Sequence, residues 1–255
     1  FEAALLALVG EWLRPARQTD VVICGMAGAK EGWLEAPFRA VPCAPLDAQL
    51  ITVPDTALNV RVIPGLRQDT PADVMRGEET QIAGFLVDDP AFDGTLCLPG
   101  THTKWVRVSA EEVVSFQTCM TGELFQMLSE ISVLRHSIAG CGEDAAAFSD
   151  AVADTISRPE KLAQRLFSLR AENVLNNLDP TKARAQLSGY LIGAELASTK
   201  PYWLGQDVAI AGAPQLASAY AAALNTQGVQ ARVYDAAQMT RAGLARFHAA
   251  LLENV

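Results

Sequence analysis

Two adjacent carboxylates, Glu78 and Glu79, have side chains that could do the chemistry of a catalytic site. They follow Arg76 and Gly77 in a segment that is otherwise apolar enough to enter a core. A carboxylate in a cleft can take a proton from a hydroxyl nucleophile, and an arginine can hold an anionic group through two parallel hydrogen bonds. A solvated helix face with an Arg76–Glu79 ion pair explains the same pattern, so both interpretations stay open.

A glycine–threonine turn between two strand-like runs forms a second group. Gly100 lets the backbone approach a ligand closely, and backbone N–H groups in such a turn can point at phosphate oxygens. Thr101 and Thr103 can donate their hydroxyl hydrogens to the same oxygens. The alternative interpretation of the turn is an ordinary tight hairpin.

Two further glycine-containing turns follow predicted strands. The segment Gly25–Trp33 contains three glycines, but their spacing fits neither the dinucleotide-binding nor the P-loop pattern. It is more typical of a loop that lines a small-molecule pocket at the carboxyl end of a strand, where Trp33 stacks on a ligand or packs in the core. The second turn, at Gly212 and Ala213, presents backbone N–H groups at the start of a helix.

Charge and composition exclude several classes of protein. The 255 residues are 50% hydrophobic and 19% charged, with a formal net charge of −9, so they suffice for one large or two modest folded domains. A nucleic-acid binder would show a basic face, and no basic run occurs. The apolar runs are broken by charge or glycine, and no signal peptide is seen, so no membrane partner is expected.

The cysteines and histidines predict neither a disulfide framework nor a metal site. Five cysteines occur without any CxxC pair, and three histidines occur without an HExxH pattern. We therefore expect reduced thiols in a cytoplasmic protein and no metal-ligating residues.

Hydrophobic periodicity and turn signals predict the elements that must position these groups. Strands are expected at 21–24, 49–53, 59–63, 95–98, 104–108, 113–116, 207–211 and 229–234. Helices are expected at 1–13, 71–87 (with Thr70 as N-cap), 122–131, 143–156, 159–176, 180–199, 213–225 and 236–253.

This order of elements indicates an α/β fold, with parallel strand pairing expected in the last strand–helix–strand–helix unit. The best candidate linker is Asp88–Gly94. It divides the chain into an N-terminal α/β lobe, residues 1–90, and a C-terminal α/β lobe with a helical insertion, residues 91–255.

Taken in order, the segments resemble the 2-dehydro-3-deoxygalactonokinase family of sugar-acid kinases. The resemblance extends from Val21 to the C-terminus, and its most specific parts are Met75–Gly84 and Leu98–Val106. The segments that carry it read GMAGAKEGWLEAP, VIPGLRQ, MRGEETQIAG, LPGTHTKWV and FQTCMTGELF. It implies the fold of the actin, hexokinase and Hsp70 superfamily, in which two ribonuclease-H-like (actin-like ATPase) domains close over ATP.

The resemblance also implies a role for each group of residues. Glu78 takes the place of the general base for the C6 hydroxyl, with Glu79 as the second candidate, and Mg²⁺ would bridge the ATP phosphates. The implied nucleotide-binding residues are Gly100, Thr101, His102 and Thr103 at the phosphates and Gly212 and Ala213 at the adenosine. The implied sugar-acid-binding residues are Met26, Gly28, Trp33, Arg67, Arg76 and Lys104, of which the arginines are the first candidates for the substrate carboxylate.

The sequence departs from the superfamily pattern at two places. The superfamily opens with a strand–turn–strand that holds an Asp-x-Gly-Thr-like first phosphate loop, and nothing of that kind precedes Phe1. We therefore expect an N-terminal lobe that lacks its first strands in this chain, and a few dozen further residues upstream. Pro99 stands where the second phosphate loop often has Asp, so no carboxylate can reach a metal from that position.

The leading hypothesis is ATP-dependent phosphorylation of 2-dehydro-3-deoxygalactonate at O6 in galactonate catabolism. Its expected partners are ATP and the sugar acid, and a homodimer is left open. One alternative is a binding protein of the same fold without turnover, and another is a kinase for the C4 epimer, 2-dehydro-3-deoxygluconate. A hydrolase or a dehydrogenase on an unrelated α/β fold has only the weak support of the glycine turns.

Overall fold

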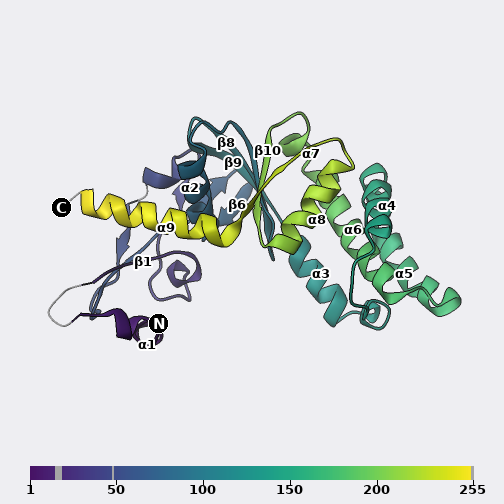
Figure 1. Ribbon diagram of the computed structural model, residues 1–255, viewed down its shortest axis with the longest axis horizontal. Coiled ribbons are helices and arrows are strands. Elements are labelled where there is room, and N and C mark those ends of the chain that lie inside the picture. The colour runs from purple at the N-terminus through teal and green to yellow at the C-terminus, as the bar shows by residue number, and fades with distance from the viewer. Residues whose placement is uncertain (15–18, 48, 254–255) are drawn as a thin grey trace. The chain divides into compact units, whose positions relative to one another are not determined.

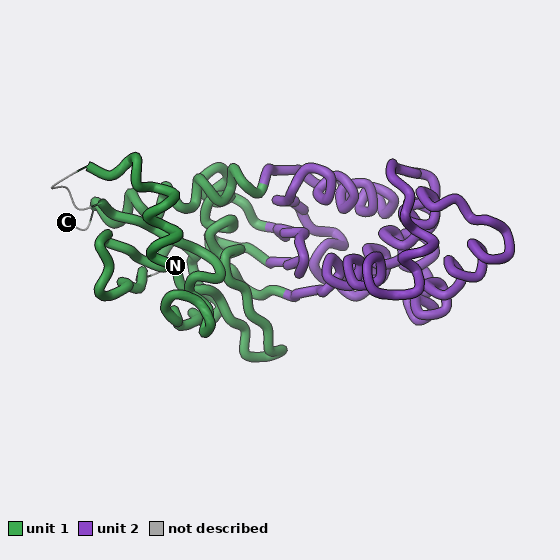
Figure 2. Tube along the Cα trace, turned by 90° about the horizontal axis from the view of Figure 1, so that it is seen from below, with its two compact units in different colours: residues 1–93, 107–116, 236–255 green, residues 94–106, 117–235 purple. Residues whose placement is uncertain are grey.

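The computed structural model describes residues 1–14, 19–47 and 49–253 (Figure 1). The chain forms two compact units, which Figure 2 shows in different colours. Unit 1 comprises residues 1–93, 107–116 and 236–255, and unit 2 comprises residues 94–106 and 117–235. The chain therefore passes between the units four times. Two of these passages lie inside strands, β8 (Thr103–Ser109) and β9 (Glu112–Cys119).

The strands of the described residues form three sheets, with the orders β1-β4-β3, β2-β5-β6 and β11-β10-β7-β8-β9. Their bounds are β1 Asp20–Ile23, β2 Arg39–Ala40, β3 Ile51–Thr52, β4 Asn59–Val62, β5 Leu66–Asp69, β6 Ala72–Met75, β7 Gly94–Leu98, β8 Thr103–Ser109, β9 Glu112–Cys119, β10 Val208–Gly212 and β11 Arg232–Asp235. The α-helices are α1 Glu2–Val9, α2 Glu78–Asp88, α3 Thr121–Glu130, α4 Ala145–Ser157, α5 Leu162–Asn176, α6 Pro180–Ser198, α7 Lys200–Trp203, α8 Pro214–Asn225 and α9 Ala236–Glu253.

Unit 1 contains two small sheets and two helices that pack closely. Strand β1 pairs with β4 in parallel, and β5 pairs with β6 antiparallel in the register Leu66↔Met75. A core cluster that includes Val60 and Val62 of β4 packs under α1 and the loop at Trp33. The short 3-10 helix η2, Gly25–Gly28, follows β1, where the sequence predicted a loop at the carboxyl end of a strand, but β1 is half-buried along its whole length.

The helix predicted at 71–87 is wrong in its first seven residues. Thr70 and Pro71 fit a helix start, but they form the turn of the β5–β6 hairpin, and α2 begins only at Glu78. Burial in β6 alternates, with Val74 51% exposed and Met75 1% exposed, which is the period of a strand. Pairing with β5 overrides the local helix-start signal.

Helices α2 and α9 approach each other through two glycines. A Cβ atom at Gly84 would lie 1.9 Å from the Met239 carbonyl oxygen, and one at Gly243 would lie 2.0 Å from the Thr80 carbonyl oxygen. Neither obstacle is a flexible side chain. This contact places α9 in unit 1, although it is the last helix along the chain (Figure 1).

Replacing Gly84 by alanine is expected to lower the free energy of unfolding by about 3 kcal/mol or more, because the methyl group has to displace backbone of α9. Urea denaturation monitored by circular dichroism measures the change. The matched control is Gly10→Ala, since no atom lies within 4 Å of a Cβ there and the backbone is helical, with φ −52°. Equal stabilities of the two variants would contradict the close contact.

Unit 2 is built on the five-stranded sheet and a block of helices. Strand β10 is buried along its whole length between β7 and β11 and pairs with both in parallel, which confirms the parallel pairing predicted for the last unit. Strands β7, β8 and β9 follow one another as the predicted meander. Buried aromatic side chains, among them Trp105, Trp203 and Tyr220, fill the core beneath the sheet.

The helical insertion lies within unit 2. Helix α6 packs against α3, α4 and α5 (Figure 1). Asp179 caps its first turn by accepting hydrogen bonds from the backbone N–H groups of Thr181 and Lys182, both at 3.0 Å. Within the described part of the chain, no helix is long and apolar enough to cross a bilayer.

The compact units differ from the two lobes expected from the sequence. Residues 107–116 and 236–255 belong to unit 1, whereas a division near residue 90 assigns them to the C-terminal lobe. The difference has a physical cause: Val113 of β9 pairs with Cys43, and α9 packs on α2, so both segments find their partners in unit 1. Unit 1 is therefore assembled from three stretches of sequence.

Candidate active site

The two candidate carboxylates lie where the chain turns sharply into α2. Gly77 precedes the helix with φ +106°, a conformation that favours glycine. A Cβ at this position would lie 3.4 Å from the Cα atom of Gly25. The turn at Gly77 and the start of η2 are therefore adjacent.

Glu78 and Glu79 have different environments. Glu78 is half-buried, and its Oε2 accepts a hydrogen bond from the backbone N–H of Arg76 at 3.0 Å. Glu79 is 1% exposed, and it accepts hydrogen bonds from the backbone N–H of Gly77 at 2.6 Å and from the Thr80 hydroxyl at 3.0 Å. Glu79 thus holds the turn from inside, and Glu78 retains access to solvent.

Burial raises the pKa of the Glu79 carboxyl to about 7, although the hydrogen bonds from the Gly77 backbone and Thr80 lower it. A carboxyl with a folded pKa above its unfolded value of 4.5 binds its proton more tightly in the native state. The contribution of Glu79 to the free energy of unfolding is therefore fully present below about pH 4.5, and it is lost as the pH rises through 7.

We expect Glu79→Gln to remove this pH dependence. Between pH 4.5 and pH 7, the stability of the wild type should fall relative to that of the variant, by roughly 3 kcal/mol in total if the full pKa difference is expressed. Urea denaturation of both proteins across this pH range measures the difference. Parallel curves for the two proteins would show that the Glu79 pKa is ordinary.

Arg76 is the cation nearest to this turn. Its Nη2 donates to the carbonyl oxygen of Ala36 at 2.8 Å, and its guanidinium lies 4.2 Å from the centre of the Phe38 ring. Its Nη1 is buried and has no hydrogen-bond partner in the described part of the chain. Burial lowers the pKa of Arg76, and Glu79 and Glu35 raise it. A buried donor of this kind lacks only an acceptor.

Gly28 makes room for that guanidinium. A Cβ at Gly28 would lie 2.9 Å from Nη1 of Arg76 and 2.9 Å from Cγ1 of Val62, so a side chain there would collide with both. Met26, in the same turn, is 70% exposed. Cys24 lies behind the turn, where burial raises the pKa of its thiol and Glu79 raises it further.

Two other sugar-acid candidates lie elsewhere in unit 1. Arg67 is on the exposed face of β5 and forms an ion pair with Asp69 at 2.5 Å, so its described contacts do not join it to Arg76. Trp33 packs against the α1 side of the unit 1 core and stacks on Phe1, with 6.1 Å between ring centres. Of the two interpretations of Trp33, packing is the one the structure favours.

In unit 2, helix α3 holds the Gly100 turn. A Cβ at Gly122 would lie 2.2 Å from the carbonyl oxygen of Gly100. The backbone N–H of Glu123 donates to the carbonyl oxygen of Thr101 at 2.9 Å. The Glu123 carboxylate lies 2.6 Å from the ring nitrogen of His102. Thr101 and His102 are exposed, so the turn presents its backbone and these side chains to solvent.

Thr103 and Lys104 point away from that exposed surface. Thr103 is fully buried, with its hydroxyl 2.8 Å from the Tyr220 hydroxyl. Lys104 is 5% exposed and donates to the Thr118 hydroxyl of β9 at 2.9 Å. The Thr103 hydroxyl is therefore part of the buried side of the turn. The Lys104 side chain joins β8 to β9, and this contact does not involve Arg76.

The second predicted nucleotide-binding turn meets the first one within unit 2. Gly212 ends β10, and Ala213 is the exposed N-cap residue of α8. A Cβ at Gly212 would lie 2.8 Å from the ring of Pro99. Glycine at position 212 thus allows the two turns to pack directly against each other.

An apolar cavity of about 130 Å³ opens beside these turns. It lies between α3, α6 and α8. The residues that line it are Gly100, Thr121, Gly122, Phe125, Ser188, Leu191, Ile192, Leu216 and Tyr220. Apart from Gly100, none of them was predicted as a site residue, because most are apolar residues at helical spacing, which cannot be told from core residues without the fold.

Sequence analysis also missed Glu195, a buried acid in α6. It is 4% exposed and accepts hydrogen bonds from the Trp105 indole at 2.7 Å and the Tyr220 hydroxyl at 2.8 Å. The one signal in the sequence is a lone carboxylate in an otherwise apolar helical stretch, 190–197.

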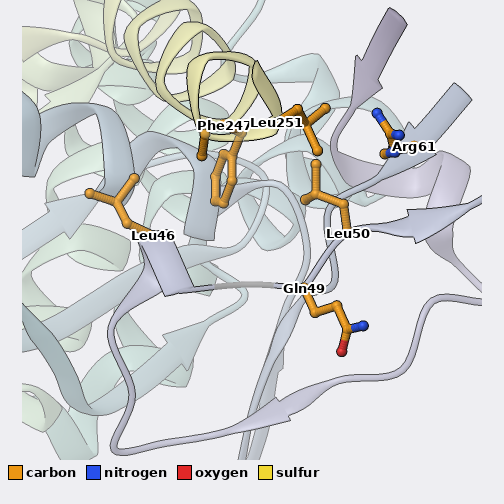
Figure 3. A pocket seen from close by; sticks show the side chains of 7 residues that line it. Leu46, Gln49, Leu50, Arg61, Phe247 and Leu251 are labelled. Atoms are coloured by element: carbon orange, nitrogen blue, oxygen red, sulfur yellow. The ribbon is translucent and has the colours of Figure 1, made fainter. Parts of the chain in front are cut away.

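A larger cavity, of about 220 Å³, lies in unit 1 under α9 (Figure 3). Leu46, Leu50, Phe247 and Leu251 give it apolar walls, and Arg61 stands at its edge. None of the predicted site residues lines it. Arg61 is held in an ion pair with Asp20 at 3.2 Å.

Among the described residues, no three His, Cys, Asp or Glu side chains gather where they could hold a metal ion.

The fold and its relatives define a class of protein. A crystal structure from Sinorhizobium meliloti, assigned as a 2-dehydro-3-deoxygalactonokinase, superposes with a TM-score of 0.91 at 38% identity, covering 98% of this chain and 86% of that one. The chain thus has the mixed α/β fold of a carbohydrate kinase. It belongs to the 2-keto-3-deoxy-galactonokinase family, whose family model matches residues 1–247.

Two curated relatives agree with this assignment. A 2-dehydro-3-deoxygalactonokinase, DgoK1, of Rhizobium meliloti is 41% identical over 232 residues, which cover 88% of this chain and 76% of the relative. The 2-dehydro-3-deoxygalactonokinase of Escherichia coli is 36% identical over 236 residues, 89% of this chain and 76% of the relative. The family resemblance inferred from the sequence is confirmed, and a hydrolase or dehydrogenase on an unrelated fold is not favoured.

Proposed function

We propose that the chain catalyses transfer of the terminal phosphoryl group of ATP to O6 of 2-dehydro-3-deoxygalactonate, in galactonate catabolism. The observation that carries the substrate assignment is the buried, unpartnered Nη1 of Arg76 beside the turn that holds Glu78. An anionic sugar acid supplies both the acceptor that this donor lacks and the hydroxyl that the carboxylate needs.

Unit 1 is the proposed sugar-acid unit. The substrate carboxylate would accept a hydrogen bond from Nη1 of Arg76, while Nη2 stays on the Ala36 carbonyl and the ring of Phe38 supports the guanidinium. The fixed guanidinium would orient the sugar acid and so favour a substrate with a carboxylate at one end and an alcohol at the other.

Unit 2 is the proposed nucleotide unit. The phosphates would lie on the exposed backbone of the Gly100–Thr101 turn, and the adenosine would lie along the Gly212–Ala213 turn and the apolar cavity beside it. This division is supported by the packing of Pro99 on Gly212 and by the apolar walls of the cavity, which suit a flat purine ring.

Glu78 is the proposed general base. The C6 hydroxyl oxygen forms a bond to the terminal phosphorus, the bond from that phosphorus to the bridging oxygen breaks, and ADP leaves with the electron pair. The hydroxyl proton passes to Glu78, which is half-buried and has one oxygen engaged by the Arg76 backbone. Backbone N–H groups at Gly100 and Thr101 would stabilise the charge on the transferred group.

Mg²⁺ is proposed to arrive with ATP and to neutralise its phosphate charge. No protein ligand is assigned to it, and the side chain of Pro99 offers no carboxylate. We further propose two ribonuclease-H-like lobes of the actin-like ATPase type and a cytoplasmic location, the latter because an odd number of cysteines without a CxxC pair is typical of reduced thiols. A homodimer stays a prediction.

A coupled ADP-release assay tests the proposed function. The purified protein with MgATP is offered 2-dehydro-3-deoxygalactonate, its C4 epimer 2-dehydro-3-deoxygluconate, or galactonate, and ³¹P NMR identifies the phosphorylated oxygen. We expect turnover with a kcat/KM at least tenfold higher for the first compound than for the epimer. ATP binding without ADP release would indicate a binding protein, and preference for the epimer would reassign the substrate.

A further inference from the structure

Four elements of unit 2 meet at one buried carboxylate. Glu195, on α6, receives hydrogen bonds from Trp105 on β8 at 2.7 Å and from Tyr220 on α8 at 2.8 Å. The Thr121 hydroxyl at the start of α3 also hydrogen-bonds to its side chain. All four residues are at most 8% exposed. A buried carboxylate is costly unless donors surround it, and here three different elements supply them.

The network continues from this carboxylate to the Gly100 turn. The Tyr220 hydroxyl has one hydrogen, and it donates that hydrogen to Glu195. Thr103, 2.8 Å from the same hydroxyl oxygen, must then be the donor in its contact with Tyr220. The hydrogen bonds therefore run in one direction, from Thr103 through Tyr220 to Glu195, and the hydroxyl hydrogen of Thr103 is directed inward.

The same residues border the proposed nucleotide cavity. Tyr220 and Thr121 line it, Gly122 follows Thr121 and touches Gly100, and Thr103 ends the turn. Glu195 therefore links the elements around the cavity through hydrogen bonds, in addition to the direct packing of α6 on α3 and α8.

We propose that Glu195 is a positioning residue for the nucleotide: its carboxylate aligns α3, α8 and the Gly100 turn, so that the phosphate-binding backbone and the cavity keep one fixed geometry. This inference rests on the proposed nucleotide site. Glu195 itself is enclosed, so it touches no substrate and acts through Tyr220, Thr121 and Thr103.

Replacing Glu195 by glutamine changes the direction of the network at almost constant shape. The amide oxygen can accept from Trp105, but the amide nitrogen then faces the Tyr220 hydroxyl as a donor. Tyr220 would donate to the Thr103 hydroxyl instead, and the hydroxyl hydrogen of Thr103 would no longer be held by Tyr220. Tyr220→Phe breaks the network at the same point without altering Glu195, and serves as the second variant.

The experiment measures ATP binding by calorimetry and the KM values for ATP and the sugar acid, at a temperature where every variant is folded by circular dichroism. We expect Glu195→Gln and Tyr220→Phe to raise the ATP Kd and KM at least tenfold and the sugar-acid KM less than twofold. The matched control is Thr155→Val, which removes a buried hydroxyl–carbonyl hydrogen bond of 3.0 Å in α4 of the same unit, and both KM values should stay within twofold.

Each outcome separates this inference from the proposed function. If the wild type binds ATP and either folded variant binds it equally well, the positioning role is overturned and the kinase assignment stands. A rise of both KM values by the same factor would overturn it as well, since that is the result of general destabilisation. If the wild type binds no ATP, the proposed nucleotide site fails and the positioning role fails with it.

Discussion

Glu78→Gln is expected to lower kcat by about two to four orders of magnitude while leaving the ATP Kd within twofold, because a neutral amide cannot take the hydroxyl proton. The fold should survive, since the glutamine carbonyl oxygen can still accept the hydrogen bond from the backbone N–H of Arg76. Steady-state ADP release and calorimetric ATP titration measure the two quantities.

Glu79→Gln is the matched comparison, because it makes the same chemical change one residue later. Glu79 is enclosed and its oxygens are engaged by the Gly77 backbone and the Thr80 hydroxyl, so we expect its replacement to reduce kcat less than tenfold. If instead the Glu79 variant loses activity and the Glu78 variant keeps it, the base has been assigned to the wrong carboxylate.

Arg76→Lys is expected to raise the sugar-acid KM by tenfold to a hundredfold with little change in the ATP KM. A charge-assisted hydrogen bond contributes about 1.5–3 kcal/mol, which corresponds to that range. Lysine keeps the charge but cannot donate to Ala36 and to a carboxylate from one planar group. Initial-rate kinetics with each substrate varied in turn provides both constants.

Arg67→Lys distinguishes the two arginines that the sequence proposed for the substrate carboxylate. Arg67 is exposed and paired with Asp69, so its replacement should leave the sugar-acid KM within twofold. The opposite pattern, with Arg67→Lys impaired and Arg76→Lys normal, would move the carboxylate site to the face of β5.

The sequence was most informative where local signals and tertiary pairing agree. The strand–helix–strand–helix unit that ends in α9 combines a clear apolar run at 208–211 with Gly212 and Pro214 at the turn, so its elements and its parallel pairing could be predicted. The segment 71–77 failed because Thr70 and Pro71 satisfy the rules for a helix start, whereas the strand depends on β5, a partner that the local pattern does not reveal.

The candidate site divides in the same way. Adjacent carboxylates and an arginine are visible in the sequence, but which carboxylate is enclosed depends on the left-handed turn at Gly77 and its contact with Gly25, about fifty positions earlier. Glu195 could not be connected to the Gly100 turn, because its donors come from residues 105, 121 and 220. Networks of this kind depend on side chains that only the folded core brings together.

Helix α9 closes unit 1 although it is the last part of that unit along the chain. During synthesis, the face of α2 that carries Gly84 therefore stays uncovered until α9 has been made, because all of unit 2 is translated between these two helices. Unit 2 is complete before α9 emerges, and its own sheet and helices can fold in the meantime. A nascent chain stalled before residue 236 should thus hold a protease-resistant unit 2 and a unit 1 that is still accessible to chaperones, so that the contact between α2 and α9 forms only after all of unit 2 has been synthesised.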